Sequence, residues 1–250
     1  MELRSYKMKN DSGFAPNPFF CTMTLATCKA PLRRVAKKGW WVAGFTSKEL
    51  CGDETGSERL VFLMEITDIM PIHKYFNCEK FQRKIPNLKT QDHMDHVGDN
   101  IYKPKVEYPC NEKEYYQIEN PSHGIDSKKD DLSGKYVLIS DNFHYFGRNP
   151  IEIDIPIRPK VPKSQAGSGW REDNIPKAKR FIRFIEDNYQ KGMIANPTRW
   201  KCNCFTEEIQ NDIMSAEMDI GSSDPKRDTD KMQDANDLFS RKINANKSCR

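Results

Sequence analysis

An aromatic and polar loop near the N-terminus holds the residues best suited to binding chemistry. Between residues 9 and 20, Asp11, Phe14 and Asn17 stand among two prolines and a glycine. Proline and glycine restrict the backbone to particular turns, which leaves neighbouring side chains free to contact a ligand. Aromatic faces stack on nucleobases, and Asn and Asp side chains hydrogen-bond to base edges. The loop therefore predicts a pocket for a base or a nucleotide.

Other rings occur beside small or polar residues further along the chain. Trp40 follows a glycine, and Asn100 lies in a Gly-Asp-Asn segment. We expect Phe14 and Trp40 to stack on the base, with Asp11, Asn17 and Asn100 contacting its polar edge. Rings in apolar runs are expected in the core, namely Trp41, Phe62 and Phe146.

A cluster of cations follows this loop. The segment 29–38 contains five lysines and arginines and ends at a glycine. We expect Lys29, Arg33 and Arg34 to face phosphate, because they lie nearest the aromatic loop and because the arginine fork makes paired contacts to phosphate oxygens. A solvated helix face accounts equally well for the remaining lysines.

Catalysis on a base is the alternative that these residues leave open. Asp11 or Asp99 would serve as a general base, and His123 as an acid near neutral pH. The chain contains no GxxxxGK[ST], GxGxxG or GxSxG motif, and its eight cysteines and five histidines allow too many pairs for one nucleophilic pair to be chosen. An enzyme requires titratable groups in the same pocket as the aromatic rings, whereas a binding protein requires only the pocket.

Metal and cofactor binding are not expected. Residues 92–96 hold two histidines and two aspartates, with Asp99 nearby, but no third histidine or cysteine pair stands at a suitable distance. Cys202 and Cys204 have a single residue between them and no second pair. The other cysteines are expected as free thiols, as is usual inside cells.

The apolar pattern predicts one α+β domain over residues 1–205. Its strands are expected at residues 3–8, 40–45, 59–67 and 136–141, in a mostly antiparallel, barrel-like sheet. Helices are expected near 29–38, 71–84 and 176–190, the last with an apolar face formed by Ala178, Phe181, Ile182, Ile185 and Tyr189. Residues 87–135 are expected to be an irregular functional loop.

Charge and composition separate a C-terminal tail from this domain. Residues 206–250 hold ten acidic and seven basic residues, a net charge of −3. The whole chain has a net charge of +4, so the first 205 residues carry +7. A basic body is compatible with a nucleic-acid partner. The tail is polar and is expected to be flexible. No apolar run reaches 18 residues and the first residues form no signal segment, so we expect a cytoplasmic protein without membrane contact.

Four segments resemble the nucleotide modification associated domain 2 family. They are DSGFAPNPF at 11–19, CTMTLATCKAPLRRVAKKGWWVAG at 21–44, GDNIY at 98–102 and YVLISDNFHYFG at 136–147. The resemblance covers roughly residues 3–200 and implies a role beside modified nucleotides, in phage and bacterial systems that hypermodify DNA bases. The motif positions that it implies are Asp11, Phe14, Pro16, Asn17, Cys21, Thr24, Lys29, Arg33, Asp99, Asn100, Tyr102, Ser140 and Phe143. Trp40 departs from the acidic residue that the family pattern has after the glycine. A looser similarity to small barrel domains of the PUA, ASCH and EVE type concerns the fold alone.

Together these observations predict recognition or processing of a modified base. The partner would be a nucleic acid or nucleotide that carries such a base, and no cofactor is implied. Two alternatives stay open, an enzyme that transfers a group to or from a base and an accessory interaction protein without a small-molecule site.

Overall fold

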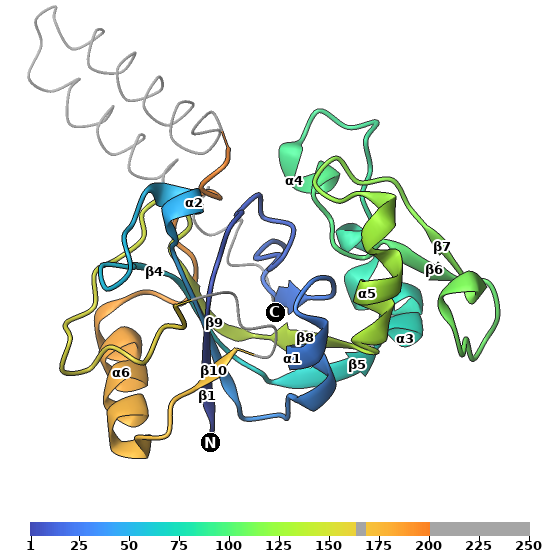
Figure 1. Cartoon of the computed structure of the whole chain (residues 1–250). Coiled ribbons are helices and arrows are strands. Elements are labelled where there is room, and N and C mark those ends of the chain that lie inside the picture. The colour runs from blue at the N-terminus through green and yellow to red at the C-terminus, as the bar shows by residue number, and fades with distance from the viewer. Residues whose placement is uncertain (164–168, 201–250) are drawn as a thin grey trace, which may run out of the picture. The chain divides into compact units, whose positions relative to one another are not determined.

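The computed structural model describes residues 1–163 and 169–200 (Figure 1). The predicted tail at 206–250 and the Cys202–Cys204 pair lie outside the described residues. The family-motif segments all lie inside them.

A six-stranded mixed sheet forms the centre of the fold. Its strand order is β10-β1-β3-β4-β9-β11. β1 and β3 are parallel neighbours, with Leu3 opposite Trp41. Parallel neighbours need a long crossover connection, and residues 8–40, which include the aromatic loop, supply it. The strands are β1 (Leu3–Lys7), β3 (Trp41–Phe45), β4 (Leu60–Glu65), β9 (Asn142–Tyr145), β10 (Trp170–Arg171) and β11 (Gly192–Met193).

Two strands continue from this sheet into a second one. β4 is followed after two residues by β5 (Asp68–Pro71), and β8 (Tyr136–Ser140) leads into β9 after one residue. β5 and β8 pair antiparallel, and β2 (Met23–Leu25) joins the other edge of β8. The α+β prediction is confirmed. The described strands form no closed barrel, so the barrel-like part of that prediction is not confirmed.

One face of the large sheet is covered by helix α6 (Ile175–Asn188). Asn174 caps this helix by accepting a hydrogen bond from the backbone N of Lys177 at 3.0 Å. Phe181 and its apolar neighbours on α6 pack in one cluster with residues of β1, β3 and β4, including Leu3 and Phe45. The amphipathic helix predicted at 176–190 is therefore confirmed.

The opposite face of the sheet is covered by β2, helix α1 (Ala30–Val35) and β8. Tyr6 and Val42 of the large sheet, and Met8 directly after β1, pack there against Leu25 and Leu32. Residues alternate between the two faces of a strand, so β1 directs Leu3 toward α6 and Tyr6 toward α1.

The segment between β5 and β8 contains more structure than the irregular loop that the sequence predicts at 87–135. Its rings pack into a third cluster with Val137 and Ile139 of β8. Each element is short, so no apolar period is long enough to reveal it. The elements are α3 (Ile72–Asn77), η1 (Glu79–Lys84), α4 (His93–His96), β6 (Tyr102–Pro104), η2 (Glu112–Glu114), β7 (Tyr115–Gln117), η3 (Ile125–Ser127) and α5 (Lys128–Ser133). The remaining helix, α2 (Lys48–Cys51), follows β3.

Three sequence expectations concern small features of the described residues. Free thiols occur at Cys28, Cys51, Cys78 and Cys110, whereas Cys21 is disulfide-bonded, which corrects the expectation for that residue. Within residues 1–163 and 169–200, no helix has the length and apolarity of a membrane span. In the same residues, no three His, Cys, Asp or Glu side chains form a cluster that would hold a metal ion.

Candidate functional site: a cavity between the aromatic loop and helix α5

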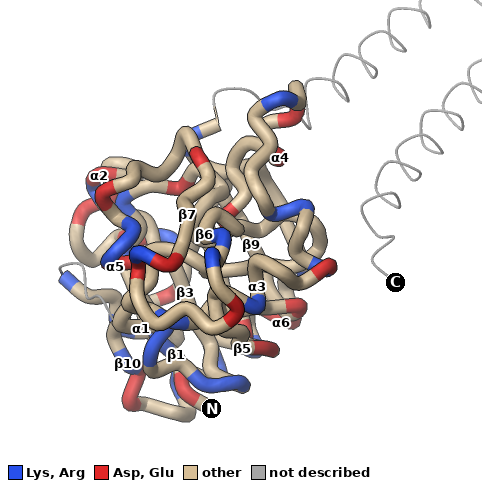
Figure 2. The backbone as a smooth tube through the Cα atoms, turned by 90° about the vertical axis from the view of Figure 1, so that its right-hand side faces the viewer, with Lys and Arg blue, Asp and Glu red and all other residues tan. Residues whose placement is uncertain are grey.

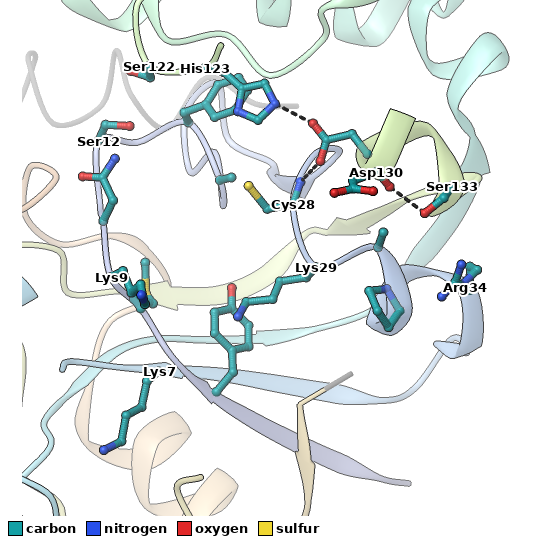
Figure 3. Close-up of a pocket in the computed structure, with 18 residues that line it drawn as sticks. Lys7, Lys9, Ser12, Cys28, Lys29, Arg34, Ser122, His123, Asp130 and Ser133 are labelled. Atoms are coloured by element: carbon teal, nitrogen blue, oxygen red, sulfur yellow. Dashed lines mark hydrogen bonds and ion pairs between the residues drawn. The ribbon is translucent and has the colours of Figure 1, made fainter. Parts of the chain in front are cut away.

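Three chain segments enclose a cavity of about 690 Å³ on the α1 side of the sheet (Figure 3). They are residues 6–15, residues 28–34 and residues 122–133. Lysines, arginines and acidic residues are interspersed over this part of the backbone (Figure 2). The cavity thus lies between the aromatic loop, helix α1 and the segment that precedes β8.

The backbone at Cys28 and Lys29 takes an unusual conformation at the cavity wall. Their φ angles are 53° and 41°, in the left-handed region that L residues rarely adopt. Each such residue costs on the order of 1 kcal/mol or more, so the surroundings must hold it. The backbone N of Cys28 donates to Asp131 Oδ1 at 2.6 Å, which supplies part of that restraint.

The buried Asp131 carboxylate organises this wall. It accepts a hydrogen bond from the Tyr102 hydroxyl at 2.7 Å, and its Oδ2 lies 2.5 Å from His123 Nε2. The His123 ring also contacts Phe14 in a tilted arrangement, with 4.9 Å between ring centroids and 31° between ring planes. Burial and the neighbouring Asp131 charge raise the pKa of Tyr102, so its hydroxyl stays protonated and donating. His123 is therefore held in one orientation at the edge of the cavity.

Arg33 braces the same wall from inside. Its side chain is fully buried and donates to the backbone oxygens of Cys28 at 2.8 Å, Tyr136 at 2.8 Å and Asp131 at 2.5 Å. A guanidinium engaged in this way joins α1 to α5 and β8. Arg33 does not line the cavity, in contrast to its neighbour Arg34, which is exposed at the rim.

Two hydrogen-bond donors, Tyr6 and Lys29, lie next to each other in the part of the cavity lining that we call its floor. The Tyr6 hydroxyl is buried and has no hydrogen-bond partner among the described residues. Lys29 Nζ lies 4.3 Å from the centroid of the Tyr6 ring, a cation–π contact. Burial lowers the pKa of Lys29 and raises that of Tyr6, and the nearby Cys28 sulfur raises the pKa of Tyr6 further. The floor is thus suited to a ligand group that accepts hydrogen bonds.

A second buried network holds several motif residues outside the cavity. Asp99 accepts from Thr24 Oγ1 and from the Tyr75 hydroxyl, each at 2.7 Å. Lys84 Nζ donates to Asn17 Oδ1 at 2.6 Å and to the Thr22 backbone oxygen at 2.7 Å. These contacts tie the aromatic loop to η1 and to the residues before β6.

Asn100 belongs to the same region. Its side-chain nitrogen donates to the backbone oxygens of Tyr75 at 3.3 Å and Phe81 at 3.2 Å. Burial raises the pKa of Asp99, and the hydrogen bonds it accepts oppose that shift. Asn17, Thr24, Asp99 and Asn100 are all buried and satisfied by protein groups, which leaves them little capacity for a ligand.

The remaining predicted site residues also lie away from the cavity lining. Asp11 accepts hydrogen bonds from the Tyr145 hydroxyl and from Thr198, and burial raises its pKa. Ser140 donates to the Asn142 backbone oxygen at 2.8 Å, and Phe143 packs in the core. Trp40 is half-buried with Arg4 over its ring at 5.3 Å.

The structure thus brings together Phe14, Lys29, Arg34 and His123 in one cavity. Sequence reasoning missed Tyr6, Cys28 and Asp131, which line the same space. Tyr6 reads as a core strand residue, and Asp131 stands in a charged stretch that resembles a solvated helix. For Cys28 the sequence does contain a signal, because this residue lies directly before Lys29 in a motif segment.

This arrangement offers aromatic faces, unpaired donors and a carboxylate-bound histidine in one space. No curated protein and no solved structure matches the chain. The family model described as nucleotide modification associated domain 2 matches residues 1–204. The chain therefore belongs to the nucleotide modification associated domain 2 family.

Proposed function

We propose that the cavity binds a nucleotide that carries a modified base. The base would lie against the Phe14–His123 wall, and the phosphate would lie toward Lys29 and Arg34. The observation that carries this proposal is that a contacting pair of rings, Phe14 and His123, and two cations line one cavity. Neither Lys29 nor Arg34 forms an ion pair with any residue in the described part of the chain.

The size and lining of the cavity support this assignment. Its volume of about 690 Å³ falls within the range of about 300–1,000 Å³ typical of small-molecule sites. The Tyr6 hydroxyl and the Lys29 amine are both donors at its floor, so they favour an oxygen-rich group such as a phosphate. The family description, nucleotide modification associated domain 2, supports a nucleotide as the ligand.

An enzyme of nucleotide modification is the second candidate, and one observation favours it. His123 is a titratable group in the same cavity as the aromatic ring of Phe14, and Asp131 orients it. Asp11 and Asp99, the other predicted acid–base residues, lie outside the cavity lining. Acid–base chemistry in this cavity would therefore depend on His123.

Isothermal titration calorimetry with matched variants tests the binding proposal. The ligands are 5′-mononucleotides and short DNA strands with a plain or a bulky 5-substituted pyrimidine. Lys29→Met and Arg34→Ala should each raise Kd about tenfold, as expected for loss of a charge-assisted contact of about 1.4 kcal/mol. The matched controls are Lys179→Met and Arg180→Ala, which lie exposed on α6.

The controls should leave Kd unchanged, and raising the salt concentration should weaken binding to the wild-type protein. Tighter binding to the modified strand supports recognition of the modified base. Equal loss of affinity in the α6 variants and the cavity variants would place the ligand elsewhere and contradict the proposal.

A further inference from the structure

The two oxygens of the buried Asp131 carboxylate contact two residues of the cavity lining, Cys28 and His123. Cys28 bonds Asp131 Oδ1 through its backbone N, and His123 Nε2 lies on Oδ2. Cys28 carries a free thiol, and Figure 3 shows its sulfur directed into the cavity on the side where His123 lies. Because Nε2 is engaged with Asp131, Nδ1 is the ring nitrogen of His123 that is left for proton exchange.

Hydrogen-bond donors face the same space. Tyr6 is 2% exposed, its buried hydroxyl lacks a hydrogen-bond partner within the described residues, and Lys29 Nζ lies over its ring. A buried hydroxyl without a partner costs about 1–3 kcal/mol, so it points to a ligand that supplies the acceptor. Donors placed beside a nucleophile stabilise the negative oxygen that forms when a carbonyl carbon is attacked.

We propose that Cys28 and His123, with Asp131 as positioning residue, carry out acyl transfer on an acylated nucleotide held in the cavity. The nucleotide part of this proposal rests on the proposed function. The substrate class is an amide or ester on the base or sugar, whose carbonyl oxygen would point toward Tyr6 and Lys29.

The chemistry balances with water as the only further reactant. The Cys28 proton moves to His123 Nδ1 while sulfur bonds to the carbonyl carbon, whose π pair moves to oxygen. The pair returns, the bond from carbon to the leaving nitrogen or oxygen breaks, and that atom takes the proton from His123. Water then gives a proton to His123 and attacks the thioester, which releases the carboxylic acid and restores the thiol.

The environment of the thiol makes the base necessary. Burial and the charge of Asp131 raise the pKa of Cys28 above its usual range. The thiol therefore keeps its proton at neutral pH until a base removes it in the reaction. His123 is the histidine in the cavity lining, so acyl transfer should depend on it.

p-Nitrophenyl acetate is a probe for this chemistry that needs no knowledge of the natural substrate. The full-length wild-type protein should release about one equivalent of nitrophenolate in a burst. Intact and peptide mass spectrometry should find the acetyl group on Cys28. Cys28→Ala should remove the burst, and His123→Asn should slow it by about 100-fold, as is typical for loss of a general base. Cys110→Ala removes an exposed free thiol outside the cavity and is the matched control.

The outcomes separate this proposal from the binding proposal. An unchanged burst in Cys28→Ala, or an unchanged rate in a folded His123→Asn protein, overturns the catalytic pair. Iodoacetamide treatment of folded wild-type protein gives a check without mutation, because alkylated Cys28 must abolish the burst. A His123-dependent burst in a protein that shows no nucleotide binding by calorimetry supports the catalytic pair and overturns only the nucleotide assignment.

Discussion

The Tyr6 hydroxyl is the residue-level feature that most directly indicates a ligand. It is buried, it lines the cavity, and it has no hydrogen-bond partner in the described residues. Most buried polar side chains in folded proteins are paired, so an unpaired donor beside a cavity is a candidate contact for a ligand. The other buried tyrosines of the site region are paired, as Tyr102 is with Asp131.

Tyr6→Phe should therefore change the free energy of unfolding and the affinity for nucleotide in opposite directions. Removing an unpaired buried hydroxyl should raise the free energy of unfolding by about 1 kcal/mol. The same change should weaken nucleotide binding, because the ligand loses a donor. The matched control is Tyr145→Phe, which removes a hydroxyl that donates to Asp11 and should lower stability. Urea unfolding measures the free energy of unfolding of both variants. A lower value for Tyr6→Phe than for the wild type would argue against an unpaired hydroxyl.

Lys84 is a second buried residue whose charge has a measurable consequence. Burial lowers its pKa from 10.5 to about 8 in the folded protein. Between pH 8 and 10.5 the unfolded chain binds more protons than the folded one, so the Lys84 contribution to stability becomes more favourable as pH rises through this range. Below pH 8 both states are protonated and the penalty for the buried charge is constant.

Comparison with Lys84→Met isolates this effect from the titration of other groups. The difference in unfolding free energy, wild type minus variant, should grow by on the order of 2 kcal/mol between pH 8 and pH 10. Urea unfolding of both proteins at several pH values gives the difference. A difference that stays flat or falls over this range would contradict a lowered pKa for Lys84.

At the scale of elements, Arg33 joins α1 to α5 and β8. Its three hydrogen bonds go to backbone oxygens on residues 28, 131 and 136. Gly134 lies against its guanidinium, since a Cβ there would stand 2.5 Å from the Arg33 Cζ. This packing fixes the α1–α5 distance and therefore the width of the cavity.

Arg33→Lys should lower the free energy of unfolding by about 3 kcal/mol, because an ammonium cannot span the three acceptors that the guanidinium reaches. Arg34→Lys is the matched control on the same helix and should change stability by less than about 0.5 kcal/mol, as is usual on a surface. Urea unfolding at neutral pH compares the two. Equal effects at the two positions would rule out a bracing role for Arg33.

The same elements show what the sequence could and could not predict. The apolar face of α6 follows from spacing alone, because Phe181 and Ile185 recur with the helical period. Spacing alone does not predict which of Arg33 and Arg34 is buried. Two adjacent cations are equivalent in the sequence, and only the packing of α5 distinguishes them. Asn17 and Asn100 have amide side chains of the kind that hydrogen-bond to base edges. In the structure these amides are already hydrogen-bonded, to Lys84 and to backbone oxygens respectively. Such long-range pairing leaves no trace in local composition.

At the scale of the whole molecule, the family model matches residues 1–204 and does not extend over the rest of the chain. The family model ends at residue 204, and the polar segment 206–250 was predicted as a separate tail. Within the described residues, the lining of the cavity falls between residues 6 and 133. The described lining of the proposed binding site thus lies within the family domain.

Removing residues 206–250 should leave the nucleotide Kd and the thermal midpoint of the remaining chain unchanged. The physical reason is that the cavity lining in the described part of the chain falls between residues 6 and 133. Calorimetric titration and differential scanning calorimetry of the full and shortened chains make the comparison. A Kd that rises severalfold on shortening would assign the tail a part in ligand binding.

Protection of Cys28 from alkylation tests the central claim, that nucleotide binds in this cavity, most directly. Cys28 and Cys110 are both exposed free thiols, and of the two only Cys28 lines the cavity. The rate of N-ethylmaleimide labelling at each site is followed by peptide mass spectrometry, with and without saturating nucleotide. Occupancy of the cavity predicts that nucleotide slows labelling of Cys28 by at least about tenfold and leaves Cys110 unaffected. Binding that leaves the Cys28 rate unchanged would show that the nucleotide lies elsewhere and would contradict the account.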